Sequence, residues 1–197
     1  RQSAEYEVAL VQREVASPKH LEAHYFNLGK MLANPNSKEN ITLSPRDQVM
    51  VFDTHSPRGA QVADMVRKLK TQATAFDPPR LFELKGYLRH GGEYPLEKGM
   101  RLLDAINVSG GVQVGTDTRY SLLVRKDQVS KKVEFIQLSL DEARKNPLGD
   151  HNPVIHPEDR IYIFDYDIDR VGLIKADIEL VKKQTGYGDL SPIVRVA

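Results

Sequence analysis

The sequence predicts an α+β protein made of tandem units, each a mixed β-sheet packed with one helix, joined by connecting helices. Three observations support this. A strand, a glycine turn, a second strand and a helix follow one another between residues 81 and 111. Much of the chain repeats at one fixed spacing, the separation of Asp53 from Asp165, which we call the repeat interval. Helical patterns separate the repeated parts, so each period is predicted to be one small domain plus a connector.

The central unit is predicted to begin with a β-hairpin. Leu81–Leu88 alternates apolar and polar residues, as a half-buried strand does. His90–Glu93 forms the turn, because Gly91 and Gly92 can take positive φ without steric cost. Tyr94–Leu96 then starts the returning strand.

A helix and three further strands complete this unit. Met100, Leu103 and Ile106 recur at a spacing of three, which is typical of an amphipathic helix. Gly110 and Gly111 are placed to end it in a left-handed C-cap. The later β-rich segments are Tyr120–Arg125, Val133–Leu140 and Arg160–Asp165. The predicted order is therefore β-β-α-β-β-β in about 85 residues, a size that can just support its own core.

The internal repeat aligns charged, apolar and turn-forming residues without a gap. The matched pairs are Arg13 with Arg125, Glu22 with Glu134, Leu28 with Leu140, Pro45 with Pro157, Asp47 with Asp159, and Lys70 with Lys182. Proline and aspartate recur at turn positions, where they have physical reasons to be, so chance is a poor explanation.

The repeat divides the chain into five predicted parts. These are the C-terminal half of a first unit at 1–56, a connecting helix and linker at 57–80, a complete unit at 81–166, a second connecting helix and linker at 167–191, and the first strand of a truncated third unit at 192–197. The connectors carry apolar residues at helical spacing, Val62, Val66 and Leu69 in one and Leu173, Ile174, Ile178 and Val181 in the other.

Composition narrows the function classes. Charge nearly balances, at 28 Lys plus Arg against 27 Asp plus Glu, which argues against a nucleic-acid partner. The lack of cysteine excludes disulfides, thiolate metal sites and cysteine nucleophiles. No phosphate-binding glycine loop, nucleophile motif or suitably spaced carboxylate pair indicates catalysis. We therefore expect a protein that is not an enzyme and uses neither cofactor nor metal.

Two constellations imitate metal sites. Asp165–Asp169 begins like a calcium-binding loop, but Arg170 and Ala176 occupy the positions that need Gly and Glu. We interpret the segment as an acidic first turn of the next helix. His20 and His24 lie four apart on a predicted strand, too far apart to chelate easily, and we interpret them as a surface pair.

Recurring arginines and aspartates invite structural interpretations beside functional ones. Arg13 and Arg125 each close an apolar strand and could meet an acidic sugar or a neighbouring subunit. We favour instead a structural pair with Glu22 and Glu134 across the adjacent strand. The aspartates that follow Pro45 and Pro157, Asp47 and Asp159, are expected to accept backbone N–H bonds within their own turns.

Taken in order, the spaced motifs of the complete unit resemble the SLBB domain, the soluble-ligand-binding β-grasp. The motifs are Gly86–Tyr94, Leu103–Gly111, Arg125 and Ile155–Ile163. The resemblance covers residues 81–165, and its second half recurs in residues 6–53. Gly91 stands where the family usually has Pro, and Ser109 where it has Ala. Arg46 and Glu158 stand where it has Gly, which predicts a type I turn in place of a type II turn.

Tandem SLBB domains separated by helices are similar to the periplasmic part of Wza-like outer-membrane exporters of capsule and exopolysaccharide. The resemblance implies tandem β-grasp units with a non-enzymatic role in the periplasm, associated with the outer membrane of a Gram-negative bacterium. The implied partners are the polysaccharide, other subunits of a homo-oligomeric exporter and an inner-membrane copolymerase.

Four residues around the first hairpin are candidates for binding glycan or a partner protein: Tyr87, Arg89, His90 and Tyr94. Aromatic and arginine side chains at a turn are suited to stacking on sugars or anchoring an interface. The alternative is ordinary cross-strand packing. A second hypothesis for function is a module that binds a soluble glycan or small ligand between this hairpin and the turn at His156–Asp159. An enzyme is the third.

The resemblance also predicts an open sheet edge. A β-grasp sheet seats its first strand centrally, beside its last, and residues 1–56 lack that first strand. The edge of Gln48–Phe52 would then be unpaired, and open edges recruit strands. We expect either Ile193–Val196 or a second copy of the chain to fill it.

Overall fold

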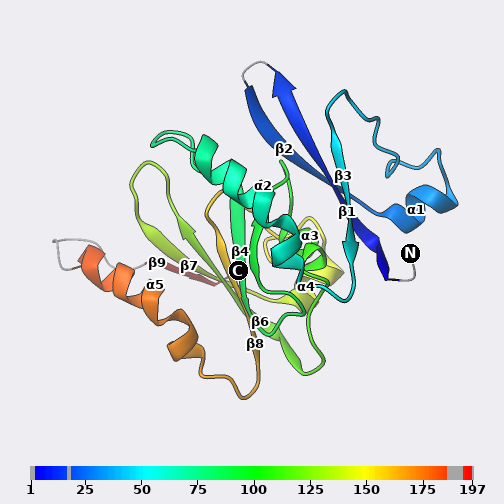
Figure 1. Cartoon of the computed structure of the whole chain (residues 1–197). Coiled ribbons are helices and arrows are strands. Elements are labelled where there is room, and N and C mark those ends of the chain that lie inside the picture. The colour runs from blue at the N-terminus through cyan, green and yellow to red at the C-terminus, as the bar shows by residue number, and fades with distance from the viewer. Residues whose placement is uncertain (1–2, 17–18, 186–192, 197) are drawn as a thin grey trace.

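The computed structural model describes residues 3–16, 19–185 and 193–196. Over these residues the chain is an α+β protein with two β-sheets and five helices (Figure 1). In chain order the elements are β1 (Ala4–Ala16), β2 (Lys19–Phe26), α1 (Leu28–Ala33), β3 (Gln48–Asp53), α2 (Arg58–Gln72), β4 (Leu81–Gly86), β5 (Gly92–Pro95), α3 (Leu102–Val108), β6 (Thr116–Lys126), β7 (Val133–Leu138), α4 (Leu140–Lys145), β8 (Arg160–Asp165), α5 (Arg170–Thr185) and β9 (Ile193–Val196).

The two sheets differ in size and in strand direction. The first has the order β2-β1-β3, and both of its strand pairs are antiparallel. The second has the order β5-β4-β8-β6-β7-β9, with parallel pairs at β4–β8 and β7–β9. We call Ala4–Asp53 the first unit and Leu81–Asp165 the second unit. The expected position of β4 beside β8 is confirmed.

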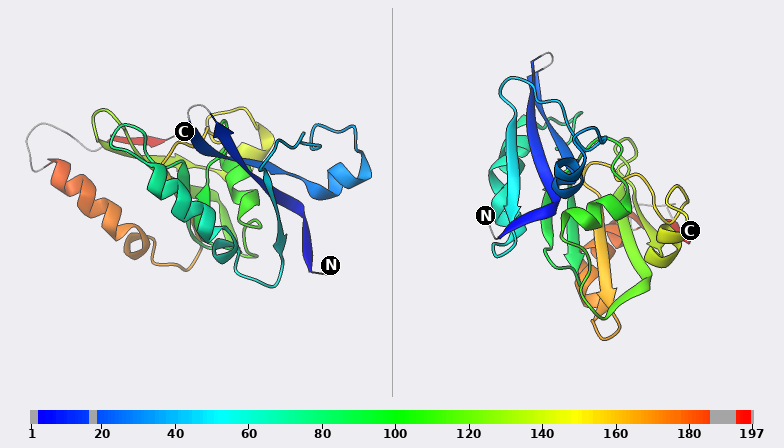
Figure 2. Two further views of the ribbon diagram at one scale, coloured as in Figure 1. Left: turned by 45° about the horizontal axis from the view of Figure 1, so that its top comes forward. Right: turned by 90° about the vertical axis from the view of Figure 1, so that its right-hand side faces the viewer.

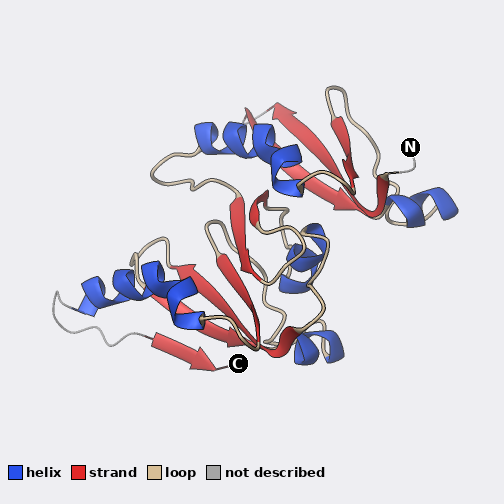
Figure 3. Cartoon of the chain, turned by 60° about the horizontal axis from the view of Figure 1, so that its bottom comes forward, coloured by secondary structure: helices blue, strands red, loops and turns tan. Residues whose placement is uncertain are grey.

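The backbone repeats at the interval seen in the sequence. β8 begins and ends one repeat interval after β3, and α4 follows α1 in the same way. Strand register repeats as well, since Arg13 lies opposite Glu22 and Arg125 lies opposite Glu134. Figure 3 shows the outcome, with α2 beside the first sheet and α5 beside the second in matching positions. Residues Ala4–Asp53 and Thr116–Asp165 therefore follow the same backbone path.

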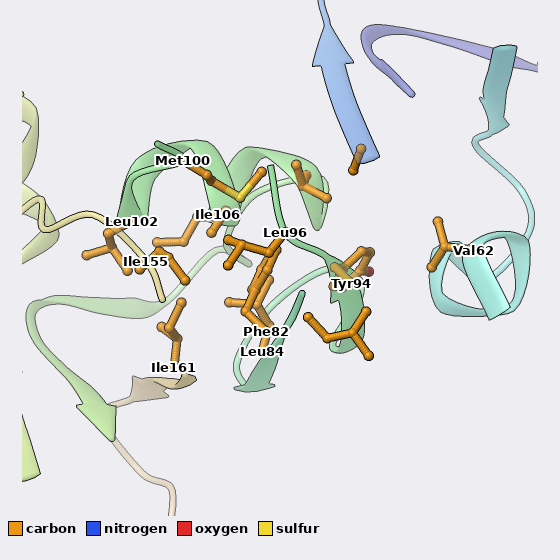
Figure 4. Packing of buried hydrophobic residues seen from close by; sticks show 14 of the residues in the cluster. Val62, Phe82, Leu84, Tyr94, Leu96, Met100, Leu102, Ile106, Ile155 and Ile161 are labelled. Carbon is orange, nitrogen blue, oxygen red and sulfur yellow. The ribbon is translucent and has the colours of Figure 1, made fainter. Parts of the chain in front are cut away.

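The core of the second unit lies between α3 and one face of its sheet (Figure 4). The buried positions of α3 are Leu102, Ala105, Ile106 and Val108. Of the predicted stripe, Met100 and Ile106 are buried as expected, whereas Leu103 is only half-buried. The helix ends in a Schellman motif: Gly110 N–H donates to Asn107 O and Gly111 N–H to Ile106 O. Both glycines have positive φ, 81° and 87°, as the sequence predicted.

Two short helices, α1 and α4, were not predicted from the sequence. The strand expected at Val133–Leu140 ends at Leu138, and α4 begins at Leu140. Asn27 and Ser139 are the N-caps, each accepting a hydrogen bond from the backbone three residues on. Each helix has only six residues, too few to produce a clear amphipathic period.

Helix α2 connects the two units and packs against both of them. Its buried residues Val62, Met65, Val66 and Leu69 belong to one apolar cluster that also contains residues of both sheets. The views in Figures 1 and 2 show α2 between the first sheet and the hairpin of the second unit, and α2 contacts β5. The two units therefore share a continuous core.

The predicted filling of the open edge by Ile193–Val196 is wrong for the single chain. β9 pairs in parallel with β7, at the far edge of the second sheet. Among the described residues β3 has a strand neighbour on one side only, so Val49 and Val51 remain 48% and 41% exposed. Pairing with a second copy stays a prediction. Within the described part of the chain, no helix is both long enough and apolar enough to cross a membrane.

Candidate functional site

Arg58, the first residue of α2, holds the two units together. Its Nη2 donates to Glu5 Oε2 of β1 at 2.9 Å, and its Nη1 donates to Val108 O at the end of α3 at 2.6 Å. The guanidinium also lies 5.0 Å from the ring centroid of Phe52 and is 3% exposed. A carboxylate and the negative end of a helix both favour a cation here, which stabilises this buried charge. We call this contact the junction.

Tyr94 belongs to the core and leaves the set of candidate binding residues. Its ring is fully buried and stacks on Phe82 with centroids 5.9 Å apart. Its hydroxyl donates to His90 O at 2.6 Å, and burial raises the pKa of Tyr94 to about 12. The cross-strand packing interpretation therefore describes this residue.

The other hairpin candidates lie at the rim of the junction. The backbone N–H of Arg89 and of His90 donate to Gly111 O and Ser109 O, both at 3.1 Å, which fixes this loop to the end of α3. A Cβ on Gly110 would come within 3.1 Å of the His90 ring. Burial, and then the charges of Arg58 and Arg89, lower the pKa of His90. His90 and Tyr87 are half-buried, and Arg89 is exposed.

The turn glycines of the hairpin play different roles. Gly92 has a φ of 135°, as expected for a position that favours glycine. Gly91 lies outside the positive-φ region, so that prediction was wrong for this residue. Glycine is favoured there for space, because an added Cβ would lie 3.1 Å from Leu84 O.

Each unit contains one arginine–aspartate lock. Arg13 Nη2 approaches Asp47 Oδ2 at 2.6 Å, and Arg125 Nη2 approaches Asp159 Oδ2 at the same distance. The same nitrogens donate to backbone carbonyls that match in the repeat, Thr42 O and Val154 O, both at 2.8 Å. Hydrogen bonding from Arg13 holds the pKa of Asp47 below its usual value.

The locks correct the predicted partner of the arginines. Glu22 and Glu134 do lie opposite them across the sheet, but the aspartates take the guanidinium forks. Arg125 is thereby committed to structure, and it is 19% exposed at its side chain. The expectation that the aspartates bond within their own turns is confirmed, because Asp47 accepts from Ser44 N–H and Asp159 from His156 N–H, both at 2.8 Å.

The turns that carry these aspartates are type II, not type I. Arg46 and Glu158 have φ of 73° and 66°, and they follow Pro45 and Pro157 at the third turn position. The 4→1 bonds close from Asp47 N–H to Ser44 O and from Asp159 N–H to His156 O. A type II turn requires positive φ at that position, so two non-glycine residues accept a conformation that favours glycine.

The composite ligand site between the hairpin and the last turn forms only in part: a pocket of about 320 Å³ is lined by Glu93 of the hairpin and by Glu158 and Asp159 of the turn, but not by Tyr87. Backbone hydrogen bonds place Glu158 beside Leu81, where β4 begins. The hairpin loop with Tyr87 follows the other end of β4. Tyr87 comes six positions after Leu81, and in an extended strand this separation corresponds to about 20 Å.

His20 and His24 flank Glu22, and their side chains are 24% and 28% exposed, so the interpretation as a surface pair holds in part. His20 Nε2 lies 2.9 Å from Glu22 Oε1, and His24 Nε2 lies 3.4 Å from Glu22 Oε2. His24 Nδ1 lies 3.5 Å from Glu97 Oε1, in the second unit, so this group also contacts across the units. Burial raises the pKa of Glu97. Among the described residues no group of three or more His, Asp or Glu side chains could hold a metal ion.

None of the known protein-family models matches this sequence, and a search of curated proteins finds no match.

Proposed function

We propose that this protein is a non-enzymatic module of a polysaccharide export protein, working in the periplasm in association with the outer membrane. Its units would be β-grasp domains of the SLBB kind that form structural and docking surfaces around the glycan conduit. Polysaccharide, other exporter subunits and an inner-membrane copolymerase are the proposed partners.

The observation that carries the proposal is the use made of the hairpin loop and the end of α3. The hairpin loop is hydrogen-bonded to the end of α3, and the end of α3 contacts Arg58, which in turn bonds Glu5 of the preceding unit and is 3% exposed. A surface committed to joining units suits a stacked assembly better than an open ligand site. The strand order supports the β-grasp assignment, because β4 lies beside β8 with α3 packed on the sheet.

The function is tested in cells that encode this protein. Deleting the gene should abolish surface polysaccharide while polymer still accumulates inside the cell, because export and not synthesis is lost. Restoring the protein with Arg58→Ala should recover surface polysaccharide only in part, since the variant loosens the junction. Surface polysaccharide would be measured by an acidic-polymer stain and by extraction.

Arg144→Ala is the matched control, because Arg144 is an exposed α4 residue whose ion pair among the described residues is with its helix neighbour Asp141. This variant should restore export fully. Unchanged surface polysaccharide in the deletion strain, or polysaccharide cleavage by the purified protein, would overturn the proposal.

A further inference from the structure

Helix α5 begins with a second copy of the junction arginine. Arg170 Nη2 donates to Asp117 Oδ2 at 2.8 Å, as Arg58 does to Glu5. The Arg170 guanidinium lies 5.3 Å from the ring centroid of Phe164, as that of Arg58 lies near Phe52. Arginine, carboxylate and aromatic ring all recur at the repeat interval. The part of the junction made by the arginine, its carboxylate partner and the aromatic ring is therefore present at both α2 and α5.

The second copy lacks the rest of the junction. Arg58 is 3% exposed and bonds the carbonyls at the end of α3, whereas the Arg170 side chain is 33% exposed. Its only further hydrogen bond among the described residues is a 3.3 Å contact with Asp165 O, just before its own helix. Among the described residues Arg170 thus bonds no helix end, whereas Arg58 bonds the end of α3.

The rest of α5 shows the same difference. Val62 and Val66 of α2 are 0% and 8% exposed, and both belong to the apolar cluster that includes residues of the second unit. Ile174 and Ile178 occupy the matching positions of α5 and are only half-buried. Val171, the neighbour of Arg170, is 66% exposed. Apolar surface on α5 is therefore open at the positions where α2 is covered.

We propose that Arg170, Val171, Ile174 and Ile178 form a docking face for a further unit with the architecture of Leu81–Asp165. The incoming unit would present the carbonyls of a glycine-ended helix to Arg170, as α3 presents Val108 O to Arg58. A second copy of this chain is not the occupant, because the end of its α3 already bonds Arg58. The inference depends on the repeat and is independent of the proposed function.

The test uses the chain lengthened by one period, in which residues 1–196 are followed by a second copy of residues 85–197. In that chain Ile193–Val196 must leave its place beside β7 and become the first strand of the added unit. The contact of α2 with the hairpin of the second unit supplies the template, because Lys70 Nζ and Glu93 Oε2 lie 2.6 Å apart there. Lys70→Cys with Glu93→Cys in the natural chain should be joined by a short bis-maleimide. The chain has no cysteine, so the background is clean.

The lengthened chain would carry Lys182→Cys in the original part and Glu93→Cys in the added copy alone. The same bis-maleimide should cross-link these two cysteines with a similar yield. Arg170→Ala should lower that yield at least tenfold, while Arg144→Ala should leave it unchanged. Hydrogen exchange of the α5 amides should also slow in the lengthened chain. That exchange gives a readout that needs no cysteine.

Three results would overturn the proposal. One is a cross-link yield no higher than that of a control with Cys at Val129, which is 93% exposed. Another is a yield that Arg170→Ala does not change. The third is a lengthened chain whose added copy fails to fold or whose α5 exchanges at the original rate, because a matching docking face must stabilise both partners.

Discussion

The first and second units follow the same backbone path but bury their matching residues to different extents. Val49 and Val51 of β3 are 48% and 41% exposed, whereas Ile161 and Ile163 at the same positions of β8 are fully buried. The difference arises because β4 pairs with β8 and α3 packs near it, while β3 has no such neighbour within the described chain. Local sequence and the arginine–aspartate locks therefore suffice to set the backbone path of a unit. How far its side chains are buried depends on the elements packed beside it.

The units also differ where the following helix meets the sheet. In the first unit Met50 and Met65 pack in the apolar cluster. In the second, the fully buried carboxylate of Asp177 pairs with Arg160 at 2.6 Å and accepts a hydrogen bond from the Tyr162 hydroxyl. Burial, followed by hydrogen bonding to Asp177, raises the pKa of Tyr162 and keeps it a donor. One position of the repeat therefore holds an apolar contact in one unit and a charged one in the other.

The largest effect is expected from matched truncations in β3 and β8. Ile163→Ala should lower the free energy of unfolding by roughly 3–4 kcal/mol, because it leaves a cavity at a fully buried site. Val51→Ala should cost about 0.5 kcal/mol, because its side chain already meets water. Urea unfolding followed by circular dichroism measures both. Equal costs would show that β3 is covered in solution.

The second prediction concerns the charged helix contact. Asp177→Ala should cost about 3 kcal/mol, because it leaves a cation and a hydroxyl without their buried partner. The same unfolding measurement applies. A loss of unfolding free energy below about 1 kcal/mol is typical of solvent-exposed ion pairs. Such a result would contradict the full burial of Asp177.

The control for this prediction replaces the charged contact of the second unit by the apolar residues found at the matching positions of the first unit. Arg160→Gln, Tyr162→Met and Asp177→Met together give α5 and β8 the residues that α2 and β3 carry. Replacing a buried ion pair by packed apolar side chains is often neutral or stabilising, so the triple variant should keep its stability within about 1 kcal/mol. A loss as large as that of Asp177→Ala would mean that the helices sit differently in the two units.

The third prediction is a pH dependence of the first lock. Because Arg13 depresses the pKa of Asp47 in the folded state, the carboxylate contributes stability above its unfolded pKa of about 4. That contribution is lost as pH falls through the lower folded value. The stability difference between the natural chain and Asp47→Asn should therefore be full at neutral pH and shrink in acid. If the stability difference between the natural chain and Asp47→Asn stays constant or grows in acid, the ion pair of Arg13 with Asp47 does not stabilise the fold.

The smallest expected effect comes from the type II turns. Positive φ costs a residue with a side chain about 1–2 kcal/mol, while glycine costs about 0.5–1 kcal/mol in chain entropy. Arg46→Gly and Glu158→Gly should therefore each raise stability by about 0.5 kcal/mol. Denaturant midpoints determined in parallel would show it. Destabilisation by either substitution would contradict the turn geometry.

The repeat can be recognised in the sequence because Pro45 and Pro157 match at turn positions without a gap. The structural role of Arg13 and Arg125 was predicted correctly, but their carboxylate partners were not. Strand pattern places Glu22 and Glu134 opposite, yet it does not show that the later turn folds back over the arginine.

The candidate site was predicted less well. Tyr94 is an aromatic residue at a turn, and sequence cannot separate a ring that stacks on Phe82 from one that faces solvent. The importance of Arg58 was missed, although a signal existed, because Arg170 recurs at the repeat interval together with Phe52 and Phe164. The pairing of β9 with β7 depends on contacts distant in sequence, which local patterns do not contain.

The most direct test of the central claim is a crystal structure of this chain, in which the backbone of Ala4–Asp53 is superposed on Thr116–Asp165. We expect the strands to coincide, Arg13 and Arg125 to grip Asp47 and Asp159 alike, and Arg58 to contact the end of α3. Different strand registers in the two segments, or an Arg58 that faces solvent, would contradict both the repeat and the junction built upon it.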